Sequence, residues 1–152
     1  MGRFVRAVLG GLLLASVISV AAAESGASFV DAAWIKAMKA GDVSAVVECY
    51  ASDAVFWGNG APLAKGTKEI RSSYEEYLSA YTVKDASLIE MGNETVGDKS
   101  FAWGRFVITI APKAGGASIT TSGRYTVMAK RIAGKWVYTL DHASADPPPA
   151  AQ

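Results

Sequence analysis

The first half of the chain places its apolar side chains with the spacing of an α-helix. Over residues 28–40, apolar positions recur at intervals of three and four, which predicts a helix with one buried face. Ser28, followed three positions later by Asp31, has the pattern of a capping box, and Gly41 favours the left-handed conformation that ends a helix. The apolar face consists of Val30, Ala33, Trp34, Ala37 and Met38.

Two more helices are predicted before the chain changes its pattern. Asp42 is a suitable N-cap for the second helix, and Thr67 is the expected cap of the third. A short strand at residues 54–57 and a loop with glycines and a proline separate the two. The apolar stripe of the second helix consists of Val43, Val46, Val47 and Tyr50. That of the third helix consists of Ile70, Tyr74, Tyr77, Leu78 and Tyr81.

From Val83 onward the apolar positions alternate with a period of two, which predicts strands. Gly92-Asn93 and Gly123 are expected to mark bulges or bends in them. Helices followed by a meander of antiparallel strands predict an α+β fold, in which three helices pack in a strongly curved sheet and leave a cavity at the open end of a cone. The predicted strands lie within residues 82–98, 99–111, 117–132 and 136–144.

The beginning of the chain has the plan of a secretory signal peptide. Arg3 and Arg6 precede an apolar run that ends in three alanines, so we expect cleavage after Ala23 and removal of residues 1–23. The alternative is an uncleaved membrane anchor, but the run is short for a stable membrane span. The remaining chain divides into a domain at residues 24–146 and a disordered, proline-rich tail at 147–152, and we expect it to be periplasmic or secreted.

Charge and residue counts exclude several kinds of partner. Without Arg3 and Arg6 the formal charge changes from +1 to −1, and no basic patch that would indicate nucleic-acid binding is present in the sequence. Cys49 is the only cysteine and His142 the only histidine, so an internal disulfide and a zinc site built on several histidines are excluded. We expect no metal, because the sequence has no His/Cys cluster, and no cofactor, because no glycine-rich phosphate loop follows a strand.

Three stretches of the chain carry a resemblance to a known family. They are "AWIKAMKAGDVSAVVECYASDAVFW" at residues 33–57, "KGTKEIRSSY" at 65–74 and "GKWVYTLDHASADPP" at 134–148. Together they resemble the SnoaL-like, ketosteroid-isomerase-like members of the nuclear-transport-factor-like superfamily, which has a cystatin-like fold, and above all its small bacterial members of unknown function. The resemblance implies the same cone-shaped α+β fold, and it identifies the fold better than the activity because this scaffold supports many chemistries.

The resemblance also allows the catalytic positions of two enzyme groups in the superfamily to be compared with this sequence. Steroid isomerases of the superfamily need a carboxylate base after the first strand and a tyrosine on the first helix. These positions fall on Gly58 and Trp34, so the isomerase machinery is absent at its usual places. Polyketide cyclases instead use an acidic residue in the last strand, for which Asp141 is the counterpart. A carboxylate in the wall of an apolar cavity has a raised pKa, which suits proton transfer near neutral pH.

Asp141 and His142 are the candidate catalytic residues. Neighbours on a strand point to opposite faces, so only one of the two is expected to face the cavity, and a directly bonded catalytic pair is not expected. The alternative is structural: Asp141 binds the backbone of the following turn, His142 lies at the rim, and Arg105 pairs with Glu90 or Glu94. The candidate ligand-binding residues are Trp34, Tyr50, Trp57, Tyr74, Trp103, Arg105 and Tyr125.

These expectations leave three functions open. The first is an exported protein that binds a small hydrophobic or aromatic molecule, whose carbonyl or carboxylate Arg105 or Arg124 would meet. The second is a homodimeric interaction module, and the third is a proton-transfer enzyme of the cyclase, isomerase or dehydratase type that uses Asp141. The dimer surface is expected on the outer face of the sheet, at Val107, Thr109, Thr121 and Val127.

Overall fold

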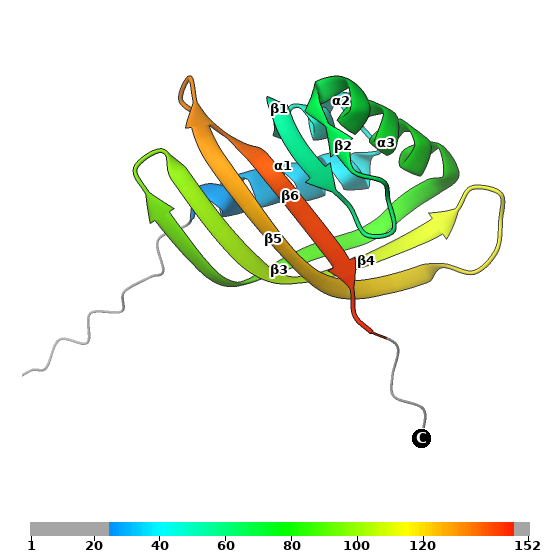
Figure 1. The fold of residues 1–152 in the computed structure, drawn as a ribbon. Coiled ribbons are helices and arrows are strands. Elements are labelled where there is room, and N and C mark those ends of the chain that lie inside the picture. Colours follow the sequence, from blue (N-terminus) through cyan, green and yellow to red (C-terminus); the bar gives the residue numbers. More distant parts are fainter. Residues whose placement is uncertain (1–24, 148–152) are drawn as a thin grey trace, which may run out of the picture.

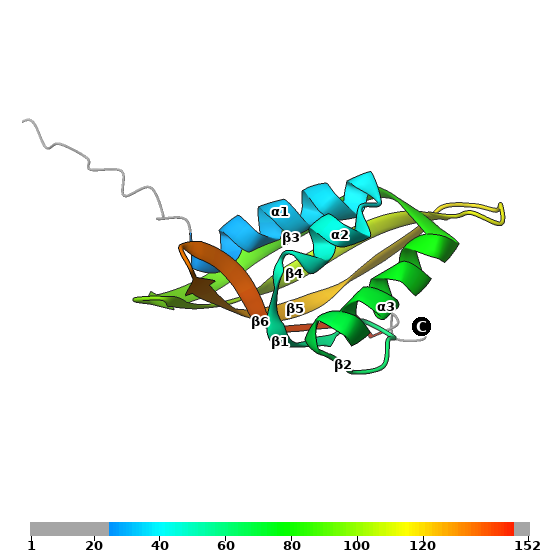
Figure 2. The same ribbon diagram turned by 90° about the horizontal axis from the view of Figure 1, so that it is seen from above.

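Helices α1, α2 and α3 lie along one face of a single curved sheet (Figures 1 and 2). The computed structural model describes residues 25–147, so the predicted signal peptide and residues 148–152 of the predicted tail lie outside the described residues. The elements in chain order are α1 (Gly26–Ala40), α2 (Val43–Val47), β1 (Tyr50–Trp57), β2 (Ala64–Lys65), α3 (Gly66–Ala80), β3 (Tyr81–Val96), β4 (Lys99–Pro112), β5 (Ile119–Ile132) and β6 (Lys135–Ala145).

The predicted α+β class is confirmed, and the sheet is curved and open. Its six strands follow the order β2-β1-β6-β5-β4-β3, so within residues 25–147 the two edge strands, β2 and β3, do not pair with each other. The sheet is also not wholly antiparallel, because β1 runs parallel to β6. The helices thus lie against the inner side of the curved sheet (Figure 2).

Gly41 ends α1 in the left-handed conformation as predicted, while of the three predicted N-terminal caps two are wrong and one is confirmed. Helix α1 begins earlier than predicted: the N-cap is Ser25, whose side chain accepts from the Ser28 N–H at 3.0 Å. Asp42 caps α2 as predicted by accepting from the Ala45 N–H at 3.0 Å. Thr67 lies inside α3, which starts without a side-chain cap.

Tyr50 starts strand β1 instead of extending the second helix. Helix α2 ends after five residues, and the backbone of the next residues turns into the sheet, where Tyr50 pairs with Tyr138 of β6. The strand predicted over residues 54–57 therefore begins four residues earlier. Because Tyr50 is the first residue of β1, its side chain lies in the core between the sheet and the helices.

A bulge in β6 decides which of its side chains face the helices. Met128 of β5 pairs with Leu140, while the next residue, Ala129, pairs with Tyr138, so Thr139 is the extra residue. Because of this shift, Tyr138 and Asp141 point to the same face although three positions separate them. Both are buried, with exposed fractions of 1% and 9%.

Two glycines of the inner face let aromatic rings lie close to the sheet. A Cβ at Gly104 would lie 2.8 Å from the Tyr125 ring and would contact the Ile89 carbonyl, and a Cβ at Gly123 would lie 2.6 Å from the Phe106 ring. Gly123 interrupts no strand pairing, so of the predicted bulge or bend at this residue the bulge is wrong. The irregularity predicted near Gly92 is confirmed, since the pairing of β3 with β4 shifts between Glu90 and Gly92.

Candidate functional site

A cavity of about 610 Å³ lies between the inner face of the sheet and helices α1 and α3. This volume is typical of small-molecule sites. Most of the wall is apolar, and the loop at residues 58–62 forms part of its mouth. The apolar lining includes Met38, Phe56, Leu88, Phe106, Ile110 and Val127.

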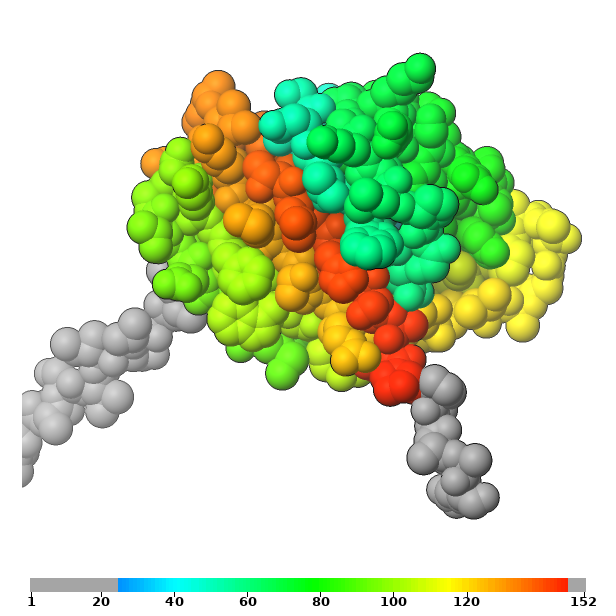
Figure 3. Space-filling view, viewed as in Figure 1, coloured from blue at the N-terminus to red at the C-terminus, as the bar shows by residue number. Residues whose placement is uncertain are grey.

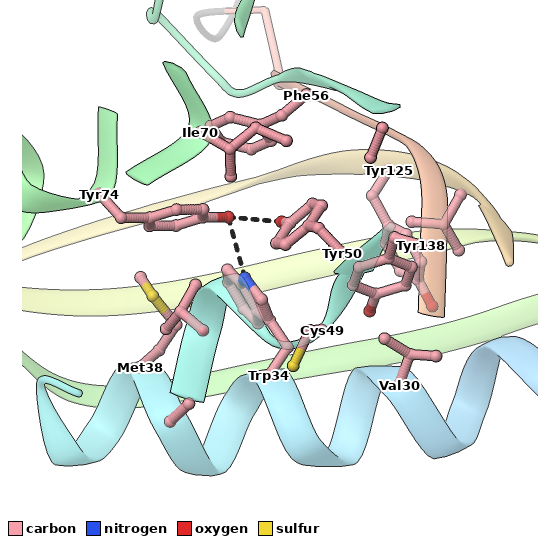
Figure 4. Packing of buried hydrophobic residues seen from close by; sticks show 14 of the residues in the cluster. Val30, Trp34, Met38, Cys49, Tyr50, Phe56, Ile70, Tyr74, Tyr125 and Tyr138 are labelled. Atoms are coloured by element: carbon pink, nitrogen blue, oxygen red, sulfur yellow. Dashed lines mark hydrogen bonds between the residues drawn. The ribbon is translucent and has the colours of Figure 1, made fainter. Parts of the chain in front are cut away.

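A chain of hydrogen bonds runs from helix α1 through the wall of the cavity to strand β6. The Trp34 Nε1–H donates to the Tyr74 hydroxyl at 2.9 Å, and the hydroxyls of Tyr74 and Tyr50 are 2.6 Å apart (Figure 4). The Tyr50 hydroxyl donates to Asp141 Oδ2 at 2.6 Å. We call these four residues the wall chain.

The wall chain has a single direction when Asp141 is ionised. A carboxylate only accepts, so the hydrogen of Tyr50 points to Asp141. Tyr50 must then accept from Tyr74, which in turn accepts from the indole of Trp34. Each hydroxyl donates once and accepts once, and hydrogen bonds in such a series strengthen one another.

Asp141 lines the cavity and keeps one oxygen for it. Burial raises the pKa of the Asp141 carboxyl to about 6; the hydrogen bond from Tyr50 lowers it in part, and the charge of Asp31 raises it further. Oδ1 makes no hydrogen bond within residues 25–147, yet no fully buried side-chain polar atom there lacks a partner. Oδ1 therefore retains contact with the open space of the cavity.

Asp31 is a second buried carboxylate, and the sequence analysis missed it as a site residue. Its oxygens accept from the hydroxyls of Tyr138 and Tyr125, the latter at 3.2 Å. Burial raises the pKa of Asp31 to about 6, against the hydrogen bonds of the two tyrosines. Its spacing gave a signal: Asp31 lies four positions after Ala27 and three before Trp34, on the buried face of α1.

The structure brings four of the predicted site residues together at the cavity and places one behind them. Trp34, Tyr74, Tyr125 and Asp141 line the cavity. Tyr50 is not among the residues of its wall; it lies behind them as the link between Tyr74 and Asp141.

The remaining predicted site residues lie on the outer face of the sheet. Trp103 and Arg105 alternate along β4 with the buried Ala102, Gly104 and Phe106, so they cannot reach the cavity. Figure 3 looks onto this outer face, with β4 in yellow-green, β5 in orange and β6 in red.

His142 also lies away from the cavity. Its ring packs against Trp57 on β1, with ring centroids 5.8 Å apart. Asp141 is buried at the cavity wall while its neighbour points the other way, so the two do not form a directly bonded pair.

Two further expectations are corrected by the register of β4 and β5. Arg105 pairs with Asp146, not with Glu90 or Glu94, and with Arg124 it lies on the outer face, so neither can meet a ligand's carbonyl or carboxylate in the cavity. Among the residues expected on the dimer surface, Val127 and Thr121 line the cavity instead.

The position of the isomerase base is filled by an aromatic ring. Gly58 borders the cavity, and a Cβ at this residue would lie 2.5 Å from the tip of the Phe56 ring. The Phe56 ring stacks on Tyr74, with centroids 5.0 Å apart. A carboxylate at position 58 would therefore displace Phe56, which explains in physical terms why this wall is apolar.

Neither a metal-ligand cluster nor a membrane-spanning helix is present between residues 25 and 147. That part of the chain holds no cluster of three or more potential metal ligands. It also contains no helix whose length and hydropathy would suffice to cross a membrane.

Comparison with known proteins places the chain among cystatin-like folds. Residues 32–139 match the family described as "SnoaL-like domain". A comparison with curated proteins gives no match.

Three solved structures illustrate the likeness. A ketosteroid isomerase-like protein from Erwinia carotovora atroseptica is 23% identical with a TM-score of 0.70, covering 79% of this chain and 93% of its own. An NTF-2-like protein of unknown function from Shewanella oneidensis is 17% identical with a TM-score of 0.62, covering 78% and 96%. A Nostoc punctiforme protein of unknown function with a cystatin-like fold is 20% identical with a TM-score of 0.59, covering 80% and 90%. At these identities the shared feature is the fold.

Proposed function

Because the chain belongs to the SnoaL-like domain family, we propose that it binds a small hydrophobic or aromatic molecule in the cavity between its helices and its sheet. The observation that carries this proposal is the cavity of about 610 Å³, lined mostly by apolar side chains, with the buried carboxylate of Asp141 in its wall. Apolar walls with a few convergent polar groups are typical of small-molecule sites.

Binding of an aromatic probe to a cavity-filling variant tests the proposal. Ala143 lines the cavity, so Ala143→Trp would occupy the space of the ligand. Ser144, its neighbour on β6, is not among the cavity residues, so Ser144→Trp is the matched control. With 2-naphthylmethanol as the probe in isothermal titration calorimetry, we expect binding to the wild type and to Ser144→Trp, and none to Ala143→Trp. Equal binding to both variants, or none to the wild type, would contradict the proposal.

A second candidate function is proton transfer by Asp141. The observation that favours it is that Oδ1 of this buried carboxylate contacts the cavity while Oδ2 accepts from Tyr50. With a pKa raised to about 6, the carboxyl exchanges protons near neutral pH. In an assay where the wild type turns over a substrate, Asp141→Asn is expected to remove the activity, and an unchanged rate would end this candidate.

The outer face of the sheet supports a homodimer. An exposed apolar cluster there includes Phe101 and Trp103, with ring centroids 5.5 Å apart, and Met128, which pairs with Phe101. We expect a dimer in light scattering at micromolar concentration and a monomer for Trp103→Lys. Val96→Lys, at an exposed residue near the end of β3, is the control that should remain dimeric. A monomeric wild type would rule out the dimer.

Export to the periplasm or the medium remains a proposal that rests on the sequence of residues 1–23. Its test is the mass of the protein after expression in a bacterium with residues 1–23 present: we expect a product that begins at Glu24. Leu13→Arg interrupts the apolar run and should leave the product unprocessed. An unprocessed wild type would contradict export by this route.

A further inference from the structure

The buried tyrosine and tryptophan side chains around Asp141 and Asp31 are arranged so that the cavity there favours a ligand that donates hydrogen bonds. Tyr50 donates to Asp141, and the hydroxyls of Tyr125 and Tyr138 both donate to Asp31. With Tyr50 so committed, Tyr74 donates to Tyr50, and the indole N–H of Trp34 donates to Tyr74. Each buried tyrosine and tryptophan donor of this wall is therefore already used inside the protein. A carbonyl or carboxylate ligand would find no free donor among them.

Among five polar residues of the lining, the one side-chain atom without a hydrogen-bond partner within residues 25–147 is an acceptor; these residues are Trp34, Tyr74, Tyr125, Tyr138 and Asp141. Asp141 Oδ1 has no hydrogen-bond partner within residues 25–147 and contacts the cavity. A buried acceptor that carries charge is costly without a partner. A ligand that brings an N–H or O–H to Oδ1 would satisfy it.

The charge of the lining favours a cation over a neutral donor. Among the described residues the cavity is lined by two carboxylates, Asp141 and Glu76, and by no lysine, arginine or histidine. Arg105 and Arg124 lie on the opposite face of the sheet. An ionised Asp141 therefore has no cationic side chain facing it across the cavity, and a positively charged ligand would supply that partner.

The aromatic residues of the wall add a second reason. Phe56 and Tyr74, whose rings stack at 5.0 Å, line the cavity together with Phe106 and Tyr125. The faces of aromatic rings attract ammonium groups, and this attraction is strongest where water is excluded. A cation held by Asp141 would be near such rings, while its hydrocarbon part would pack against the aliphatic wall.

We propose that the ligand class of this cavity is a lipophilic amine, bound as its ammonium ion with an N–H donating to Asp141 Oδ1. This inference rests on the proposed function and makes its substrate class specific. It departs from the expectation of a carbonyl or carboxylate ligand, for which the arginines would have to lie inside. Glu76, which also lines the cavity, adds a negative charge that favours entry of a cation.

Three probes that share one ring system test the inference. They are 2-naphthylmethylamine, 2-naphthylmethanol and 2-naphthoic acid, titrated at pH 7.5 by calorimetry. We expect the amine to bind about ten-fold or more tightly than the alcohol, and the acid to bind weakest. Asp141→Asn should weaken the amine about ten-fold and change the alcohol by less than about three-fold. Asp53→Asn, which removes the same charge from an exposed residue of β1, is the matched control and should change neither.

The outcomes separate this inference from the proposed function. If the acid bound as tightly as the amine, or if Asp141→Asn weakened amine and alcohol equally, the amine inference would be wrong while binding in the cavity would stand. If none of the three probes bound to the wild type, the proposed function would fail and the inference with it. The comparison among probes on the wild type needs no variant, so it holds even if Asp141→Asn folds poorly.

Discussion

Tyr50, the first residue of β1, donates a hydrogen bond of 2.6 Å to Asp141 of β6, 91 positions later in the chain. Strands β1 and β6 are parallel neighbours in the sheet, so the first residue of β1 lies close to β6, the last strand of the chain. This bond holds one oxygen of the carboxylate in the wall and leaves the other toward the cavity. The proposed roles of Asp141 all depend on that arrangement.

Removing the Tyr50 hydroxyl should raise the pKa of Asp141 above about 6. Tyr50→Phe takes away the donor that stabilises the carboxylate and leaves Asp141 Oδ2 and the Tyr74 hydroxyl without their shared partner. We expect a loss of about 1–3 kcal/mol in the free energy of unfolding. Denaturant unfolding and a ¹³C titration of the carboxyl measure the two effects. Tyr77→Phe, a half-buried tyrosine at the cavity, should change neither; an unaltered pKa in Tyr50→Phe would contradict the geometry.

The protein should lose stability as the pH rises through the pKa of its buried carboxyls. The folded state raises the pKa of Asp141 from 3.8 to about 6, so between these values it holds a proton that the unfolded chain has lost. The stabilising contribution of the protonated form is present below pH 3.8 and is lost as the pH rises through about 6. The full difference is on the order of 3 kcal/mol.

Asp141→Asn isolates this effect because it keeps an acceptor for Tyr50 and has no charge to bury. The free energy of unfolding of the variant, minus that of the wild type, should increase between pH 4.5 and 7.5, as measured by urea unfolding at each pH. Asp53→Asn, at an exposed residue, should show a constant difference. A constant difference for Asp141→Asn would show that its pKa is ordinary in the folded state.

Much of the fold could be predicted from the sequence, because helical and strand periodicity reflect which side chains are buried. The pattern around Trp34 and the alternation along β4 each identified a buried face. The alternation also contained the information that Trp103 and Arg105 share a face opposite to Phe106. Their assignment to the cavity followed residue type instead of that register, which is why it differs from the structure.

The parts of the site that escaped prediction depend on single-residue irregularities and on tertiary contacts. The extra residue Thr139 shifts β6 so that Tyr138 and Asp141 share a face, and no local pattern marks it. Asp31 was interpreted as part of a helix cap, because acidic residues are common near helix starts. Its burial depends on the hydroxyls of Tyr125 and Tyr138, which come from strands about 100 positions away.

Cys49 should be protected from alkylation in the folded protein. The side chain is buried, and burial raises the pKa of the thiol from 9.0 to about 11, which lowers the thiolate fraction at pH 8 about 100-fold. Because the chain has no other cysteine, iodoacetamide modification followed by mass measurement reports on this residue alone. We expect fast modification in denaturant and slow modification without it. Equal rates would show that the thiol is not buried in the folded protein.

Gly104→Ala should disturb the Asp31 side of the cavity wall. The added Cβ would meet the Ile89 carbonyl and lie 2.8 Å from the Tyr125 ring, so Tyr125 must move from the position where it donates to Asp31. We expect a loss of about 1–3 kcal/mol in the free energy of unfolding. Val107→Ala, on the opposite face of the same strand, removes volume without a clash and should leave the Tyr125 resonances in place. Unshifted Tyr125 resonances in Gly104→Ala would contradict the close packing.

The most direct test of the central claim, that Asp141 is a buried carboxylate facing a ligand cavity, is a ¹³C NMR titration of its side-chain carboxyl with and without saturating 2-naphthylmethanol. The resonance can be assigned by its absence in Asp141→Asn. The account predicts a pKa of about 6 in the free protein and a clear change of the resonance when the probe is added. A pKa near 3.8, together with a resonance that does not respond to the probe, would contradict it.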